Sequence, residues 1–149
     1  MNVYVVEDSR SIRERISEMV VDIGATVVGE AVEPASAVLG ILKTRPDSVI
    51  LDLQLEGGSG LDVLRAVHPS HPEILFITVT NFPNAQYRRS CFAAGATHFL
   101  DKNTEFSRVR EVLRELAPNV AATEHLSSRT NRILPQKESV MTISTRSAP

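Results

Sequence analysis

The stretch SVILDLQLEGGSGLDVL, residues 48–64, joins a continuous apolar run to a glycine-rich loop, and Asp52 stands at the junction. Residues 49–51 form an apolar run, which is typical of a strand that is buried on both faces. The spacing of Leu61 and Leu64 predicts a helix after the loop. Because burying an ionised carboxylate in a sheet is costly, Asp52 calls for a partner cation, a hydrogen-bond donor or a chemical role.

The same alternation of a short apolar run and a helical period continues along the first 117 residues. The predicted strands are residues 3–6, 25–31, 48–53, 74–80 and 97–100. A helix is predicted after each strand; Ser9 or Ser11 is placed to cap the first helix, Asn84 the fourth and Thr104 the last. Strands that are apolar throughout and alternate with helices are typical of a parallel sheet covered on both faces. The sequence therefore predicts an α/β domain.

Polar residues follow the predicted strands at the points where the strands end. In open parallel sheets the ligand site lies beyond these carboxyl ends, so we expect the polar side chains to converge. They are Glu7, Asp8, Asp52, Thr80 and Lys102. Three carboxylates repel one another unless a cation lies among them, and Mg²⁺ prefers oxygen ligands. With the metal screening its charge, Asp52 could attack a phosphoryl group, while Lys102 and Thr80 could each bind a phosphoryl oxygen.

The composition favours one domain with an appendage. The chain has 149 residues, of which 42% are hydrophobic, and its formal net charge of −2 gives no argument for a nucleic-acid or membrane partner. A lone cysteine, Cys91, cannot form an internal disulfide. The sequence also lacks a recognisable signal peptide and an apolar run of the ~20 residues that a membrane-spanning helix needs. We therefore expect a cytoplasmic protein.

Residues 118–149 differ from the rest of the chain. They contain many serines and threonines, scattered prolines and no sustained hydrophobic period. We expect a disordered tail here and no output domain, which makes residues 1–117 the expected folded domain.

Over residues 1–117 the sequence resembles the receiver domain of two-component response regulators. The resemblance rests on the acidic pair Glu7-Asp8, the segment DLQL that begins at Asp52, Thr80 at the end of a strand, and the segment FLDK that ends at Lys102. These motifs occur in the order found in the family. Two prolines that are common in the family are replaced, one by Glu56 and the other by Asn103.

The resemblance implies a flavodoxin-like, doubly wound sheet of five parallel strands in the order 2-1-3-4-5. It implies that Asp52 accepts the phosphoryl group, that Thr80 and Lys102 sense it, and that Phe99 is the aromatic switch residue. The implied Mg²⁺ ligands are Glu7, Asp8, Asp52 and the backbone carbonyl of Gln54. Thr78, on the same side of its strand, is the alternative hydroxyl to Thr80.

The function that we expect is that of a stand-alone receiver. Its phosphoryl donor would be a histidine kinase or a histidine phosphotransfer protein, and its output would be contact with a downstream protein. We expect no direct DNA binding, no membrane binding, and no enzyme activity beyond its own phosphoryl transfer and dephosphorylation. One alternative is a pseudo-receiver that binds partners without phosphorylation. The other is a haloacid-dehalogenase-like phosphatase, but its D-x-D motif is missing, because the first strand is followed by Glu7, Asp8, Ser9 and Arg10.

Overall fold

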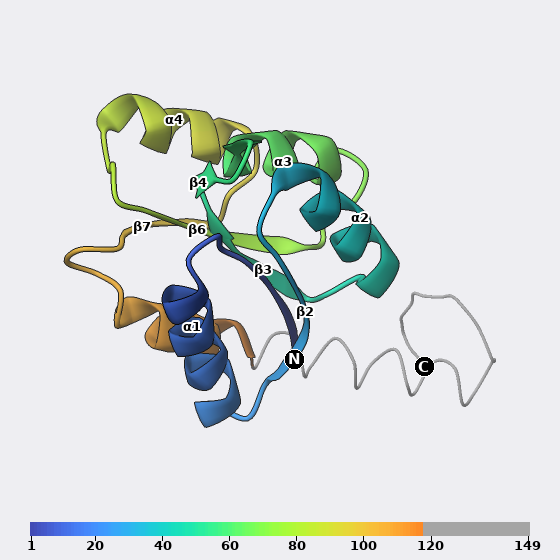
Figure 1. The fold of residues 1–149 in the computed structure, drawn as a ribbon, viewed down its shortest axis with the longest axis vertical. Helices are drawn as coiled ribbons and strands as arrows, with labels where there is room; N and C mark the ends of the chain where they lie inside the picture. The colour runs from blue at the N-terminus through green and yellow to red at the C-terminus, as the bar shows by residue number, and fades with distance from the viewer. Residues whose placement is uncertain (118–149) are drawn as a thin grey trace, which may run out of the picture. The chain divides into compact units, whose positions relative to one another are not determined.

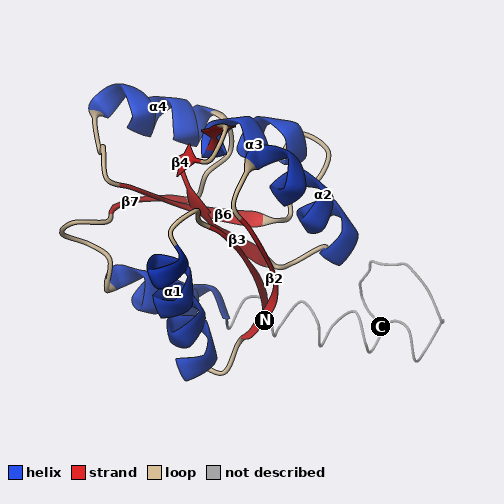
Figure 2. Ribbon diagram, viewed as in Figure 1, coloured by secondary structure: helices blue, strands red, loops and turns tan. Residues whose placement is uncertain are grey.

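Five parallel strands form the central sheet of the computed structural model, which describes residues 1–117 (Figures 1 and 2). The strands are β1 (Asn2–Val6), β2 (Thr26–Ala31), β3 (Ser48–Asp52), β6 (Leu75–Thr80) and β7 (His98–Asp101). Their order in the sheet is β2-β1-β3-β6-β7. Because β6 and β7 are the fourth and fifth of these strands along the chain, the predicted order 2-1-3-4-5 is confirmed.

Helices cover both faces of this sheet. They are α1 (Arg10–Asp22), α2 (Pro34–Thr44), α3 (Gly60–Val67), α4 (Ala85–Ala93) and a last helix whose described residues are 108–117. Figure 2 shows α1 and the beginning of the last helix on one face, and α2, α3 and α4 on the other. Every residue of the central strand β3 is buried, as a strand between two helical layers requires.

Contact clustering divides the chain into the units Met1–Leu113 and Arg114–Pro149. The first unit contains the whole sheet and all the residues discussed below. Of the second unit, residues 114–117 are described, and they are helical. The predicted tail, residues 118–149, lies outside the described residues.

The helix caps agree with the sequence in two cases and differ in one. Ser9 caps α1 by accepting a hydrogen bond from the Ile12 N–H, and Asn84 caps α4 in the same way. Thr104 does not cap the last helix, which begins at residue 108. The segment before it forms turns instead, closed by reciprocal hydrogen bonds between Asp101 and Glu105. These local bonds satisfy the backbone where the first helical turn was predicted.

Two details of the sheet were not predicted. A small antiparallel pair, β4 (Gln54–Leu55) and β5 (Gly58–Ser59), lies in the loop that follows Asp52. In addition, the Tyr4 ring occupies space that a Cβ atom at Gly29 or Gly40 would overlap. Gly29 lies on β2 and Gly40 on α2. Because neither glycine has a side chain, β1, β2 and α2 can approach one another closely around Tyr4.

Candidate functional site

Four of the residues chosen from the sequence meet at the carboxyl ends of the strands. Glu7 and Asp8 follow β1, Asp52 ends β3, and Lys102 follows β7. The carboxylates of Glu7, Asp8 and Asp52 each offer an oxygen, and these oxygens lie within 4.8 Å of one another. Lys102 Nζ lies 2.7 Å from Glu7 Oε1 and 3.0 Å from Asp52 Oδ2. The ammonium group is therefore shared between two carboxylates.

This cluster is buried except at Asp8. The side chains of Glu7 and Asp52 are each 1% exposed and that of Lys102 is 5% exposed, whereas Asp8 is exposed. The attraction within a buried ion pair is stronger than within a pair on the surface. Burial also has a cost in free energy, because both charged groups lose their hydration. The cluster thus combines two desolvated carboxylates with a third that borders on solvent.

Backbone N–H groups fix the two buried carboxylates. The Ser9 N–H donates to Glu7 Oε2 at 3.1 Å, and the Gln54 N–H donates to Asp52 Oδ1 at 3.0 Å. Each donor lies two residues beyond its acceptor, in the segment that follows the strand. The structure therefore uses Gln54 through its N–H, and the role of its carbonyl as a metal ligand stays a prediction.

The pKa of Glu7 is raised from 4.5 to about 7. Burial is the largest cause, and the nearby charge of Asp52 acts in the same direction. The hydrogen bond from Lys102 lowers the pKa but does not compensate for burial. Near neutral pH, Glu7 in the metal-free protein is therefore only partly ionised.

This shift predicts that the metal-free protein loses stability as the pH rises from about 4.5 to about 7. In that window folded Glu7 is protonated while unfolded Glu7 is ionised, so raising the pH favours the unfolded state. The contribution is of order 3 kcal/mol. Urea unfolding in EDTA between pH 5 and pH 8 should show a steeper decline for the wild type than for Glu7→Gln. Parallel curves for the two proteins would contradict the prediction.

The contacts of the two threonines favour Thr80 as the functional hydroxyl. The Thr78 hydroxyl donates to the backbone carbonyl of His98 at 2.7 Å, which uses its only proton within the sheet. Thr80 Oγ1 instead accepts a hydrogen bond from the Phe82 N–H at 3.0 Å, and its own proton is not used in that bond. Thr80 also accepts the Lys102 N–H at its carbonyl, at 2.8 Å, which links it to the cluster.

Phe99 lies apart from the carboxylate cluster. It is 6% exposed and packs in the hydrophobic core, on β7 opposite Thr78. The Arg88 guanidinium of α4 lies 5.8 Å from the centre of its ring and 5.1 Å from that of Phe92. The proposed switch residue is thus buried and covered by a cation from α4, and its change of exposure stays a prediction.

The donor set fits Mg²⁺. Three carboxylates within 4.8 Å supply only oxygen atoms, which this hard cation prefers. When all three carboxylates are ionised, the ammonium group of Lys102 balances only one of their negative charges. A divalent cation beside the exposed carboxylate of Asp8 would compensate the remainder.

Arg13 contacts the acidic pair, and sequence reasoning missed it. Its Nη1 donates to the backbone carbonyl of Glu7 at 2.9 Å and to that of Asp8 at 3.4 Å, and its Nε contacts Glu30 at 3.2 Å. The sequence carries one weak signal, because a basic residue near the first turn of a helix opposes the helix dipole. In the structure, Arg13 is explained by its hydrogen bonds to the carbonyls of the loop after β1.

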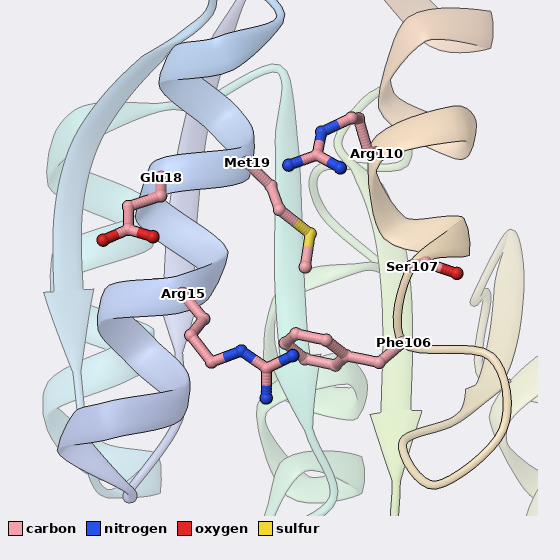
Figure 3. A pocket seen from close by; sticks show the side chains of 6 residues that line it. All are labelled: Arg15, Glu18, Met19, Phe106, Ser107 and Arg110. Atoms are coloured by element: carbon pink, nitrogen blue, oxygen red, sulfur yellow. The ribbon is translucent and has the colours of Figure 1, made fainter.

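A separate hollow of about 270 Å³ lies between α1 and residues 106–110, which end the turn segment and begin the last helix (Figure 3). Its lining residues are Arg15, Glu18, Met19, Phe106, Ser107 and Arg110. Figure 3 shows the Arg15 guanidinium against the Phe106 ring, at 4.5 Å from the ring centre. None of the clustered carboxylates lines this hollow, so it belongs to a different part of the surface.

None of the helices within residues 1–117 combines the length and the apolar character required to cross a membrane.

Several curated relatives of this chain are response regulators. It is 30% identical over 115 residues to the response regulator GacA of Pseudomonas protegens, a match that covers 76% of this chain and 54% of the relative. It is 31% identical over 120 residues to a nitrate/nitrite response regulator protein homolog of Haemophilus influenzae, covering 78% of this chain and 57% of that protein. The chain thus spans about half the length of these curated relatives.

Similarity to solved structures leads to the same family. A signal receiver domain from Vibrio parahaemolyticus matches with a TM-score of 0.73 and 26% identity, over 84% of this chain and 95% of the other. The REC domain of AraT from Geobacillus stearothermophilus shares the fold, with a TM-score of 0.72, 24% identity, and coverage of 83% and 97%. Residues 3–114 match the family model described as the response regulator receiver domain. By fold, by the order of its site residues and by this match, the chain belongs to the receiver domain family of response regulators.

Proposed function

We propose that this receiver takes a phosphoryl group onto Asp52 from a histidine kinase or a histidine phosphotransfer protein. The observation that carries the proposal is the cluster itself. The Asp52 carboxylate, at the carboxyl end of the central strand, is held by one backbone N–H and by Lys102, beside two further carboxylates. A buried carboxylate with this environment is suited to act as a nucleophile.

In the proposed reaction an oxygen of Asp52 attacks phosphorus, and the bond from phosphorus to the donor imidazole nitrogen breaks. The imidazole keeps the electron pair of that bond, and Asp52 becomes an acyl phosphate. Mg²⁺, held by Glu7, Asp8, Asp52 and the Gln54 carbonyl, would neutralise the charge that develops on the phosphoryl oxygens. Lys102 and Thr80 would each bind one of these oxygens, Lys102 by leaving its shared ion pair and Thr80 by its O–H.

The proposed output is a change in a protein-binding surface around α4, β7 and the last helix. New contacts from Thr80 and Lys102 to the phosphoryl group would favour a second conformation in which Phe99 changes its exposure. A ligand shifts such an equilibrium only through contacts that differ between the two states. The burial of Phe99 beneath Arg88 supports this proposal, because a rearrangement of α4 would alter the contacts of both residues.

The two alternatives have less support. A module that binds partners without phosphorylation would not need residues able to accept a phosphoryl group, whereas this chain has the acidic cluster and Lys102 together. A haloacid-dehalogenase-like nucleophile would follow the first strand, where Glu7 is paired with Lys102. Some relatives are named protein-glutamate methylesterase, but this chain covers only 34% of the one from Haloarcula marismortui. We propose that residues 1–117 act as a signalling receiver and not as an enzyme.

The experiment that tests the proposal is intact mass measurement after incubation with acetyl phosphate. We expect a gain of one phosphoryl group in the presence of MgCl₂ and none in EDTA. Reduction with borohydride should then convert the phosphorylated residue, and peptide mapping should locate the change at Asp52. A protein that gains no phosphoryl group with Mg²⁺, or that gains one at another residue, would contradict the proposal.

A further inference from the structure

Arg13 connects three parts of the domain at the edge of the carboxylate cluster. It lies near the start of α1, contacts Glu30 on β2, and donates to the carbonyls of the loop that carries the acidic pair. Its side chain is 18% exposed, so most of its length is packed against these elements. Glu30 is held in turn by the Ser17 hydroxyl, at 3.2 Å from its second carboxylate oxygen.

The contact with Asp8 is the informative one. Glu7 has its own supports, since its carboxylate is bound by Lys102 and by the Ser9 N–H. Within residues 1–117, no hydrogen bond or ion pair joins the Asp8 carboxylate to another group. The position of that carboxylate therefore depends on the backbone of residue 8, and Arg13 is the side chain that binds the carbonyl there, at 3.4 Å.

We propose that Arg13 is a positioning residue for Mg²⁺, and that it sets the metal affinity by holding the Asp8 backbone so that its carboxylate faces Glu7 and Asp52. This inference rests on the proposed function, because it assumes that the acidic cluster binds Mg²⁺. Groups that orient metal ligands commonly change the metal affinity by about 10-fold or more when they are removed. The fork of a guanidinium group can serve two carbonyls and a carboxylate at once, which an ammonium group cannot do with the same geometry.

Charge and positioning predict opposite results for Arg13→Met. Removing a positive charge close to a cation site should leave Mg²⁺ binding unchanged or make it tighter. Losing the hydrogen bond from Arg13 to the Asp8 carbonyl should instead weaken Mg²⁺ binding. Arg10→Met is the matched control, because Arg10 is on the same helix and carries the same charge. Its side chain is 84% exposed, and among residues 1–117 its ion pair is with Glu14 alone.

The test is a MgCl₂ titration at constant ionic strength, followed by backbone amide chemical shifts, for the wild type, Arg13→Met, Arg13→Lys and Arg10→Met. We expect Kd to rise about 10-fold in Arg13→Met, to rise less in Arg13→Lys, and to stay the same or fall in Arg10→Met. Urea unfolding in EDTA, measured in parallel, verifies that each variant is folded, and Arg13→Lys keeps the charge if Arg13→Met does not fold.

Two results would overturn the inference in different ways. If the wild type binds Mg²⁺ and Arg13→Met binds it as tightly as Arg10→Met does, Arg13 only stabilises the fold, and the proposed function stands. If the wild type shows no saturable Mg²⁺ binding, the metal site fails, and the inference about Arg13 fails with it.

Discussion

Asp52→Asn is expected to abolish the uptake of a phosphoryl group from acetyl phosphate. The amide nitrogen and oxygen of asparagine are far weaker nucleophiles than a carboxylate oxygen, and no other carboxylate in the cluster ends the central strand. The substitution is nearly isosteric, so the hydrogen bond from the Gln54 N–H can be kept. Intact mass measurement with MgCl₂ should show one added phosphoryl group in the wild type and none in the variant.

The same variant should also alter the titration of Glu7. The charge of Asp52 is one cause of the raised pKa of Glu7, so removing it should lower that pKa. The loss of stability between pH 5 and pH 8 in EDTA should then be smaller in Asp52→Asn than in the wild type.

Asp62→Asn is the control for both measurements, since Asp62 is an exposed carboxylate in the first turn of α3. It should take up the phosphoryl group normally and keep the pH dependence of the wild type. Phosphorylation of Asp52→Asn to the wild-type extent would show that the acceptor is another residue.

Lys102→Met is expected to lower the free energy of unfolding by about 3 kcal/mol at pH 8 in EDTA. Lys102 is the cation shared by the buried carboxylates of Glu7 and Asp52, and its loss leaves both charges without a partner. The destabilisation should be smaller at pH 6, because Lys102 lowers the pKa of Glu7 and its removal lets Glu7 take up a proton more readily. MgCl₂ should restore part of the stability, since the metal can replace the missing positive charge.

This variant should also fail to accept a phosphoryl group efficiently, because a cation that binds the transferred oxygens is lost. Lys43→Met provides the comparison: Lys43 is an exposed lysine in the last turn of α2, away from the cluster. Urea unfolding at pH 6 and pH 8, with and without MgCl₂, measures all of these effects. A Lys102→Met protein as stable as Lys43→Met in EDTA at pH 8 would show that the shared ion pair contributes nothing net.

The strands could be predicted because their signals are local and repetitive, whereas their order in the sheet was implied by the resemblance to receiver domains. The strands β1, β3 and β6 are largely apolar runs that end at, or are followed by, polar residues, and their alternation with helices is typical of a parallel sheet. The pair β4 and β5 escaped prediction, since two-residue strands have no hydrophobic period. The last helix was predicted to begin after Thr104, but it begins at residue 108. Asp101 and Glu105 form a turn by bonding to each other's backbone, and such a turn has no hydrophobic period from which it could be predicted.

The sequence by itself determined which residue types end each strand, and therefore that Glu7, Asp8, Asp52 and Lys102 would meet at one edge of a parallel sheet. Only the tertiary structure decided how they interact. It places one ammonium group between two buried carboxylates, uses the Thr78 hydroxyl within the sheet, and brings Arg13 to the backbone of the acidic loop. The reason is physical: the strand ends follow from a periodic pattern along the chain, whereas desolvation and hydrogen-bond geometry depend on side chains that are distant in sequence and meet only in the folded domain.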